Sequence, residues 1–197
     1  MKIYDISQEV FSSEVYPGDP SPKANKLYSM DDGALYNLSE FCMCAHNGTH
    51  IDAPRHFIKD GKAIDELELS HLVGKATVIS FTGIIDGLEA ENIINEVKNT
   101  DSEAAKRLII KGEATVTEEA AEVFAGAGIY LLGVESQSVG PMDAPMKAHQ
   151  ILLGKEVVLL EGVRLKDVPD GRYILFAAPL KLAGFEGSPC RATLIEI

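Results

Sequence analysis

The chain has 197 residues, of which 46% are hydrophobic and 24% are charged, so it is long enough to bury one core. Its 18 basic and 30 acidic residues give a net charge of −12, which opposes binding to nucleic acid or to an anionic membrane surface. We therefore expect one domain over residues 1–197, without nucleic-acid or membrane partners.

The N-terminal residues and the number of cysteines are evidence on where in the cell the protein lies. The first residues are strand-like rather than a basic and then apolar signal segment, and no apolar run has the length of a membrane span. The three cysteines, Cys42, Cys44 and Cys190, are too few for a disulfide framework. These features predict a cytoplasmic protein. Because Cys42 and Cys44 alternate as in a strand, we expect them to pack, with thiolate ligation of a metal as the alternative.

The first third of the chain contains two expected strands and a turn. Residues 2–7 and the apolar residues 37–45 are typical of strands, and the second of these leads into a histidine-rich segment. Between them, Val15–Pro20 contains a Pro-Gly step that favours a tight turn. Tyr16 in this turn is either a surface residue or an aromatic wall of a binding pocket.

The histidine-rich segment His46–His56 holds three of the five histidines and one aspartate. Gly48, the β-branched residues and Pro54 disfavour a helix here, so we expect a loop or a bent strand. On an extended backbone, His50 and Asp52 project to the same side. Since imidazole and carboxylate groups are ligands of zinc and similar divalent ions, the segment predicts a metal site.

Strands and helices alternate between Lys75 and Leu160, which predicts parallel strands joined by helical crossovers. Thr115 with Glu118 offers a capping box for the second helix, and Asp143 is a candidate N-cap of the third. With further strands near both ends of the chain, the pattern predicts an α/β fold in which helices pack on a mixed sheet or a partly closed barrel. The expected strands cover residues 75–82, 107–111, 129–134, 157–160, 172–182 and 191–197, and the expected helices cover residues 88–97, 117–125 and 143–153.

Two candidate ligands lie outside the histidine segment. His149 shares a helical spacing with Met142, Met146 and Leu153, so it should face the interior, where an ordinary core histidine is the alternative. Glu161 ends the apolar run 157–160, and open α/β sheets bind ligands at the carboxyl ends of their strands. Simple exposure at the strand end is the alternative for Glu161. His71 has no such neighbours, and we expect it to be structural.

The spacing His46-x-Gly48-Thr49-His50-x-Asp52-x-Pro54-x-His56 resembles the signature of the metal-dependent cyclase hydrolases, which include bacterial kynurenine formamidases and are related to isatin hydrolase. Tyr16–Asp19, residues 133–141, residues 149–153, Glu161-Gly162 and residues 187–192 resemble other motifs of this family. The resemblance implies a compact swivelling β/β/α-type domain that assembles as a homodimer or a larger homo-oligomer.

The resemblance also implies the roles of individual residues. His46, His50, Asp52 and Glu161 would surround one metal ion, and Asp52, His149 and Glu161 would surround a second. His56 would act as the general acid and base. We expect one or two zinc ions per subunit, with manganese, iron or cobalt as alternatives.

The activity implied by the resemblance is hydrolysis of an amide by metal-bound hydroxide, with protonation of the leaving amine by His56. Arylformamidase activity on N-formylkynurenine, which yields kynurenine and formate in tryptophan catabolism, is the first expectation. A cyclic amide or lactone hydrolase of the isatin type is one alternative, and a non-catalytic metal- or small-molecule-binding protein is another. In formamidases a tryptophan stands at the position of Tyr16 and contacts the substrate. Residues 135–138 differ from the Asp-Thr-Pro-Ser run of formamidases, and the carboxylate of Glu135 is a candidate for a place near the pocket.

Overall fold

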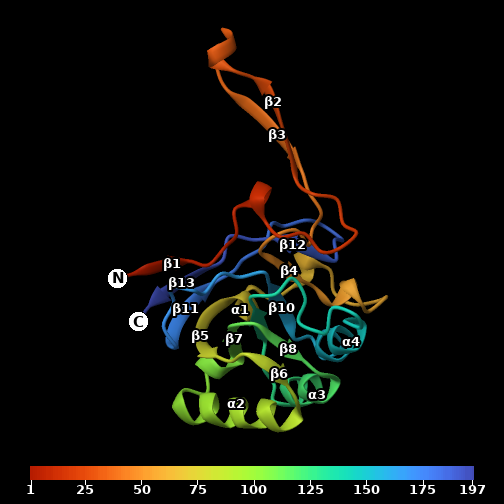
Figure 1. Ribbon diagram of the computed structural model, residues 1–197, viewed down its shortest axis with the longest axis vertical. Helices are drawn as coiled ribbons and strands as arrows, with labels where there is room; N and C mark the ends of the chain where they lie inside the picture. The colour runs from red at the N-terminus through yellow and green to blue at the C-terminus, as the bar shows by residue number, and fades with distance from the viewer.

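A nine-stranded mixed sheet is the centre of the computed structural model, which describes residues 1–197 (Figure 1). Its strand order is β1-β13-β11-β5-β7-β9-β10-β4-β12. The strands are β1 (Ile3–Asp5), β4 (His50–Asp52), β5 (Val73–Ser80), β7 (Arg107–Lys111), β9 (Leu131–Val134), β10 (Val158–Glu161), β11 (Gly171–Phe176), β12 (Gly187–Pro189) and β13 (Thr193–Glu196).

The direction of the strands follows the pattern of the sequence. The four central strands β5, β7, β9 and β10 are parallel, as the alternation of strands and helices predicted. Antiparallel strands flank them, with β11, β13 and β1 on one side and β4 and β12 on the other. The expectation of a mixed sheet with packed helices is therefore confirmed.

Helices cover one face of this sheet. They are α2 (Gly87–Thr100), α3 (Glu118–Gly126) and α4 (Met146–Gly154), and a short α1 (Leu69–Leu72) precedes β5 (Figure 1). α2 buries Ala90, Ile93, Ile94 and Val97, whose spacing forms one apolar stripe, and Asp86 caps its N-terminus. None of the helices is long and apolar enough to cross a membrane.

Both faces of the central strands are buried. In β7, Leu108 and Ile110 join the apolar cluster beneath the helices, whereas Ile109 joins a second cluster on the opposite face. Leu160 in β10 and Ile51 in β4 belong to this second cluster. Parallel strands that are covered on both faces are apolar throughout, which is why they were recognisable in the sequence.

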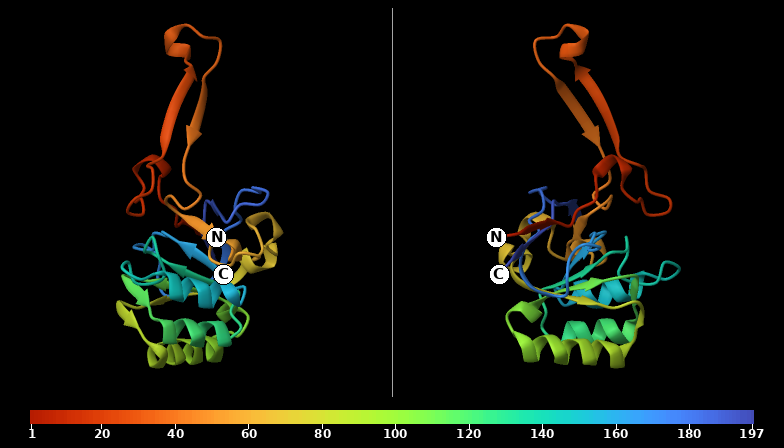
Figure 2. Two further views of the ribbon diagram at one scale, coloured as in Figure 1. Left: turned by 90° about the vertical axis from the view of Figure 1, so that its right-hand side faces the viewer. Right: turned by 60° about the vertical axis from the view of Figure 1, so that its left-hand side comes forward.

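Two short sheets lie outside the main one. β6 (Gly83–Ile85) pairs with β8 (Ala114–Val116) in parallel. β2 (Lys23–Tyr28) pairs with β3 (Leu38–Cys42) in an antiparallel arm that projects far from the rest of the chain (Figure 2). The predicted strand 37–45 is thus real but shorter, and it lies in the arm instead of the core. β2 was not predicted, because its polar residues lack an apolar alternation.

Two predicted helix caps are wrong. α3 begins at Glu118 with Thr117 as its N-cap, because the Thr117 hydroxyl accepts a hydrogen bond from the Ala120 N–H (3.2 Å). Thr115 lies in β8 and cannot serve there. α4 begins at Met146 after Pro145, so Asp143 precedes the helix by a turn.

Two further expectations about side chains and strand ends are also corrected. Met142 and Met146 are exposed, so the interior face of α4 does not include them. The predicted strand 172–182 ends at Phe176. Beyond it the chain makes only an isolated bridge between Pro179 and Cys190.

Candidate metal centre

Antiparallel pairing of β4 with β10 joins two distant parts of the candidate site. His50 lies opposite Glu161, and Asp52 lies opposite Leu159. Because alternate residues of a strand point to the same side, His50 and Asp52 share one side, and Glu161 shares it with its partner His50. His50, Asp52 and Glu161 are all buried. The sheet therefore brings two carboxylates and an imidazole together in its interior.

Gly48 and Thr49 fix the bend that precedes β4. Gly48 has a φ of +64°, in the left-handed region that favours glycine. The Thr49 hydroxyl donates a hydrogen bond to the Gly162 carbonyl (2.7 Å) and accepts one from the Gln8 N–H (2.9 Å). These two residues of the histidine segment therefore shape the backbone.

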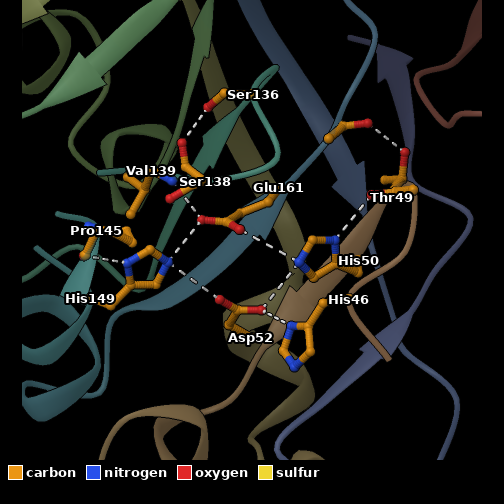
Figure 3. A network of polar contacts seen from close by, with 12 residues as sticks. His46, Thr49, His50, Asp52, Ser136, Ser138, Val139, Pro145, His149 and Glu161 are labelled. Carbon is orange, nitrogen blue, oxygen red and sulfur yellow. Dashed lines mark hydrogen bonds and ion pairs between the residues drawn. The ribbon is translucent and has the colours of Figure 1, made fainter. Parts of the chain in front are cut away.

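Backbone carbonyls orient two of the histidines. His149 is buried and comes from α4, and its Nδ1–H donates to the Pro145 carbonyl (2.8 Å). His50 Nδ1–H donates in the same way to the Gly48 carbonyl (3.0 Å). Each ring is left with Nε2 directed at the carboxylates (Figure 3). An Nδ1–H held by a carbonyl is typical of a histidine whose other nitrogen binds a metal.

Asp52 and Glu161 lie between the histidines (Figure 3). Asp52 Oδ1 is 2.7 Å from His46 Nδ1 and 3.3 Å from His50 Nε2. Asp52 Oδ2 is 3.7 Å from His149 Nε2. Glu161 Oε2 is 3.5 Å from His50 Nε2, and its Oε1 is 3.2 Å from His149 Nε2. Both carboxylates thus connect the histidine segment with His149.

The buried carboxylates alter the protonation of the histidines. Burial opposes a charged ring at His50, but hydrogen bonds with Asp52 and Glu161 outweigh it and raise the pKa of His50 to about 10. Burial also opposes the charged ring of His149, but Glu161 outweighs it and raises the pKa of His149 to about 9. Burial opposes ionisation of Asp52 too, yet His46 and His50 hold its pKa well below the usual value. The two carboxylates therefore favour positive charge beside them.

The donor atoms of the cluster fit divalent metal ions. Those of His46, His50 and Asp52 lie within 4.8 Å of one another, and so do those of Asp52, His149 and Glu161. Asp52 Oδ2 and His46 Nε2 are buried without a hydrogen-bond partner, which is costly unless another ligand satisfies them. Mixed nitrogen and oxygen donors suit zinc, manganese and similar ions. The structure thus brings together all five residues that the resemblance implied as ligands.

His56 lies next to this cluster, in the 3₁₀ turn Pro54–His56 that follows β4. Its ring stacks on the ring of His46, with 4.0 Å between centroids and 25° between planes. Phe57 packs against it edge-on at 4.4 Å. Burial lowers the pKa of His56, and although Asp52 opposes this, the neighbouring histidines reinforce it. A neutral ring in this position can accept a proton.

A cavity of about 580 Å³ opens over the cluster. Tyr16 lines it, and the Tyr16 hydroxyl donates to the Met142 carbonyl at 3.5 Å. Apolar walls with a few polar groups are typical of a small-molecule site. The other residues that line the cavity are Asp19, Met43, Cys44, Ala45, His46, His50, His56, Phe57, Gln137, Ser138, Pro145, His149, Glu161, Phe185 and Glu186.

Three polar residues near the cluster were not predicted from the sequence. Gln137 and Ser138 line the cavity, and their side-chain polar atoms have no hydrogen-bond partner. Glu186 Oε1 is 3.5 Å from His46 Nε2. The sequence did contain a signal for Gln137 and Ser138, because both lie in the run 135–138 that differs from the family motif. It contained no signal for Glu186, because β12 and the residues beside it are too short to form a pattern.

The expectation for Glu135 is wrong. Its carboxylate accepts hydrogen bonds from the Gly112 N–H (2.7 Å) and the Leu165 N–H (2.9 Å), and it does not line the cavity. The Glu135 carboxylate therefore satisfies two backbone N–H groups, one directly after β7 and one in the segment that follows β10.

The cysteines and His71 lie outside the metal cluster. Cys42 is exposed on β3, so the expectation that it packs is wrong, whereas Cys44 is half-buried at the cavity wall. Neither belongs to a group of side chains able to hold a metal. His71 stacks on Tyr130 with 4.4 Å between ring centroids, and it stands apart from the site.

Comparison with known proteins identifies relatives along the whole chain. Residues 4–141 match the Cyclase family, described as "Putative cyclase". A kynurenine formamidase of Bacillus anthracis is 34% identical, and the match covers 100% of this chain and 98% of that protein. A kynurenine formamidase of Salinibacter ruber is 33% identical over 98% of this chain and 97% of its own length.

Solved structures share the fold. A predicted metal-dependent hydrolase from Bacillus stearothermophilus superposes with a TM-score of 0.79 at 28% identity, covering 98% of this chain and 97% of its own. Isatin hydrolase A from Labrenzia aggregata, bound to benzyl benzoate, superposes with a TM-score of 0.81 at 22% identity, covering 98% of this chain and 93% of its own.

Proposed function

This chain belongs to the Cyclase family and is a hydrolase of that family, and we propose that it cleaves an amide C–N bond with the help of bound divalent metal. The observation that carries the proposal is the position of Asp52 and Glu161 between His50 and His149, with His56 beside them. Asp52 and Glu161 each lie close to His50 of β4 and to His149 of α4, and two carboxylates placed in this way suit a pair of divalent ions.

The chain's own residues would hold the metal at two adjacent positions. His46, His50 and Asp52 form the first set, to which Glu161 lies close enough to contribute, and Asp52, His149 and Glu161 form the second. When bound, a divalent ion lowers the pKa of water and polarises a carbonyl group. We expect zinc, with manganese as the main alternative.

His56 moves the proton in this mechanism. Its neutral ring accepts a proton from the attacking water, and the same ring nitrogen then gives the proton to the leaving nitrogen of the amide. The stack on His46 and the edge contact with Phe57 hold the ring in place beside the cluster. Burial of the ring keeps its pKa below the usual value, so it is ready to accept the proton at neutral pH.

The leading substrate is an aryl formamide such as N-formylkynurenine. Two kynurenine formamidases at 33% and 34% identity, matched along nearly their whole length, support this choice. Tyr16 and Phe57 give the cavity aromatic walls for an aryl ring.

A cyclic amide is the second candidate, and Gln137 favours it. Both polar atoms of the Gln137 side chain lack a hydrogen-bond partner, and the residue lines the cavity. A primary amide offers one donor and one acceptor side by side, which matches the N–H and C=O edge of a lactam. An aryl formamide presents no such fixed edge.

One experiment tests both candidates. The purified protein is analysed for metal content and assayed with N-formylkynurenine, isatin and simple esters, before and after treatment with a chelator. We expect bound metal, and hydrolysis of an amide that is lost with the metal and returns when the metal is restored. Metal-loaded protein that hydrolyses none of these compounds would overturn the proposed activity.

A further inference from the structure

Gln8 connects three segments of the chain beside the metal cluster. It follows β1 and is half-buried, and its own N–H donates to the Thr49 hydroxyl (2.9 Å). Its side-chain Nε2–H donates to the Gly162 carbonyl (2.8 Å). Its Oε1 accepts a hydrogen bond from the Glu14 N–H (2.9 Å). One side chain therefore ties the N-terminal segment to the histidine segment and to the end of β10.

Two of these contacts lie against the metal cluster. Thr49 directly precedes the candidate ligand His50, and Gly162 directly follows Glu161. The Gly162 carbonyl accepts hydrogen bonds from both the Thr49 hydroxyl (2.7 Å) and Gln8. The packing here is close, since a Cβ at Gly162 would lie 2.7 Å from Gln8 Nε2. The position of Gln8 is therefore fixed relative to the strands that present His50 and Glu161.

The third contact holds the loop that carries Tyr16. Glu14 lies two residues before Tyr16, in a stretch without helix or strand. The Glu14 carboxylate is also 3.0 Å from Arg164 Nη2, but its side chain is 66% exposed, and exposed ion pairs contribute little. The Tyr16 hydroxyl reaches the Met142 carbonyl only at 3.5 Å, which is the limit of a hydrogen bond. The bond to Gln8 is therefore the main polar tie between this loop and the segments of the metal cluster.

We propose that Gln8 is a positioning residue, which fixes the place of Tyr16 relative to the metal cluster and thereby favours substrates with an aryl ring. The inference rests on the proposed function, in which Tyr16 is an aromatic wall of the cavity. A wall that is already in place binds an aryl ring without the further cost of ordering a loop. Without the Gln8 side chain, the loop is free to move away from the cluster, and the aryl ring loses a contact surface.

The primary amide of Gln8 suits this task because it carries a donor and an acceptor on one planar group. The Gly162 carbonyl takes up the donor, and the Glu14 N–H takes up the acceptor. A carboxylate at this position would satisfy only the Glu14 N–H, and it would bring a negative oxygen to the Gly162 carbonyl. An alanine methyl group would satisfy neither.

The test is a double-mutant cycle on the binding of kynurenine, measured by isothermal titration. Kynurenine is the aryl product of the leading candidate substrate and contains no amide to cleave, so the titration does not depend on hydrolysis. We expect Gln8→Ala and Tyr16→Ala each to weaken binding by about 3- to 10-fold, which corresponds to the loss of roughly one hydrogen bond or one aromatic contact. Because Gln8 acts through Tyr16, the double variant should bind no more weakly than Tyr16→Ala alone.

A second pair of variants tests the loop without changing Gln8. Glu14→Pro removes the N–H that donates to Gln8 together with the carboxylate, whereas Glu14→Gln removes only the charge that faces Arg164. Ser13 has an extended backbone (φ −67°, ψ 155°), which suits the residue before a proline. Glu14→Pro should weaken kynurenine binding as much as Gln8→Ala does, and Glu14→Gln should bind like the natural chain.

Asn92→Ala is the control for the loss of a side-chain amide, because Asn92 is exposed on α2, and its affinity for kynurenine should match that of the natural chain. The metal content by elemental analysis should be the same in all variants, since no candidate ligand is changed.

Three results would overturn the inference. They are additive effects of Gln8→Ala and Tyr16→Ala, loss of metal from Gln8→Ala, and a natural chain that does not bind kynurenine. Since hydrolysis enters none of these measurements, the proposed activity can fail while the role of Gln8 holds, and the role of Gln8 can fail in an active enzyme.

Discussion

The rings of His46 and His56 stack at 4.0 Å, and the proposed function gives the two residues different tasks. His46 contacts Asp52 through Nδ1 at 2.7 Å and belongs to the metal cluster. His56 belongs to no set of candidate ligands. In the proposed mechanism, the stack places the proton-accepting ring of His56 beside the candidate metal ligands, while His56 itself is not one of them.

His56→Ala should keep the metal and lose most of its turnover. Removing a positioned general acid and base commonly costs about 100- to 10,000-fold in rate. Metal content by elemental analysis and kcat on the best substrate of the panel would be measured together. His71→Ala is the control, since His71 stacks on Tyr130 away from the site, and its kcat should stay close to that of the natural chain. Near-normal turnover of His56→Ala would remove His56 from the mechanism.

Asp52→Asn should lose bound metal, because Asp52 contributes to both candidate sets of ligands. A ligand that binds only the folded chain raises its stability, so a chelator should lower the melting temperature of the natural protein. The same chelator should leave the melting temperature of Asp52→Asn unchanged. Differential scanning fluorimetry with and without chelator makes this comparison. Equal shifts in the two proteins would show that the metal does not bind at Asp52.

Gly187→Ala should weaken metal binding while the fold is retained. A Cβ at Gly187 would lie 2.5 Å from His46 Cε1, and 3.0 Å from both His46 Nε2 and the Ile51 carbonyl oxygen, so the imidazole ring must move and the neighbouring β4 backbone must adjust slightly. When the groups that hold a metal-binding side chain in place are disturbed, metal affinity typically falls by about 10- to 100-fold. Gly126→Ala is the control, because a Cβ there meets nothing within 4 Å. Isothermal titration of both variants with zinc would detect the difference, and equal affinities would argue against His46 as a ligand.

The thiol of Cys190 should react slowly in the folded chain. Burial raises the pKa of Cys190 from 9.0 to about 12, so the reactive thiolate is scarce at pH 8. Iodoacetamide at pH 8 should modify Cys190 much faster in urea than in the native protein, as followed by mass spectrometry of the peptides. The Cys190 thiol loses its proton more readily in the unfolded chain than in the folded chain. It therefore lowers the free energy of unfolding as the pH rises from about 9 towards 12.

The sequence alone determined the features that depend on local repetition. The central strands were recognisable because burial on both faces makes them apolar throughout, and α2 because its apolar residues recur at the helical spacing. The extended form of His50–Asp52 followed from Gly48 and Pro54, which exclude a helix. This local form was sufficient to place His50 and Asp52 on one side.

Only the tertiary structure decided which distant residues meet. The pairing of His50 with Glu161 depends on the strand order β10-β4, which no local pattern encodes. The interior position of His149 likewise follows from the packing of α4 against the sheet, and the apolar spacing that predicted it includes Met146, which is exposed. The arm escaped prediction for the opposite reason. Its strands have no core to face, so their residues do not alternate between apolar and polar.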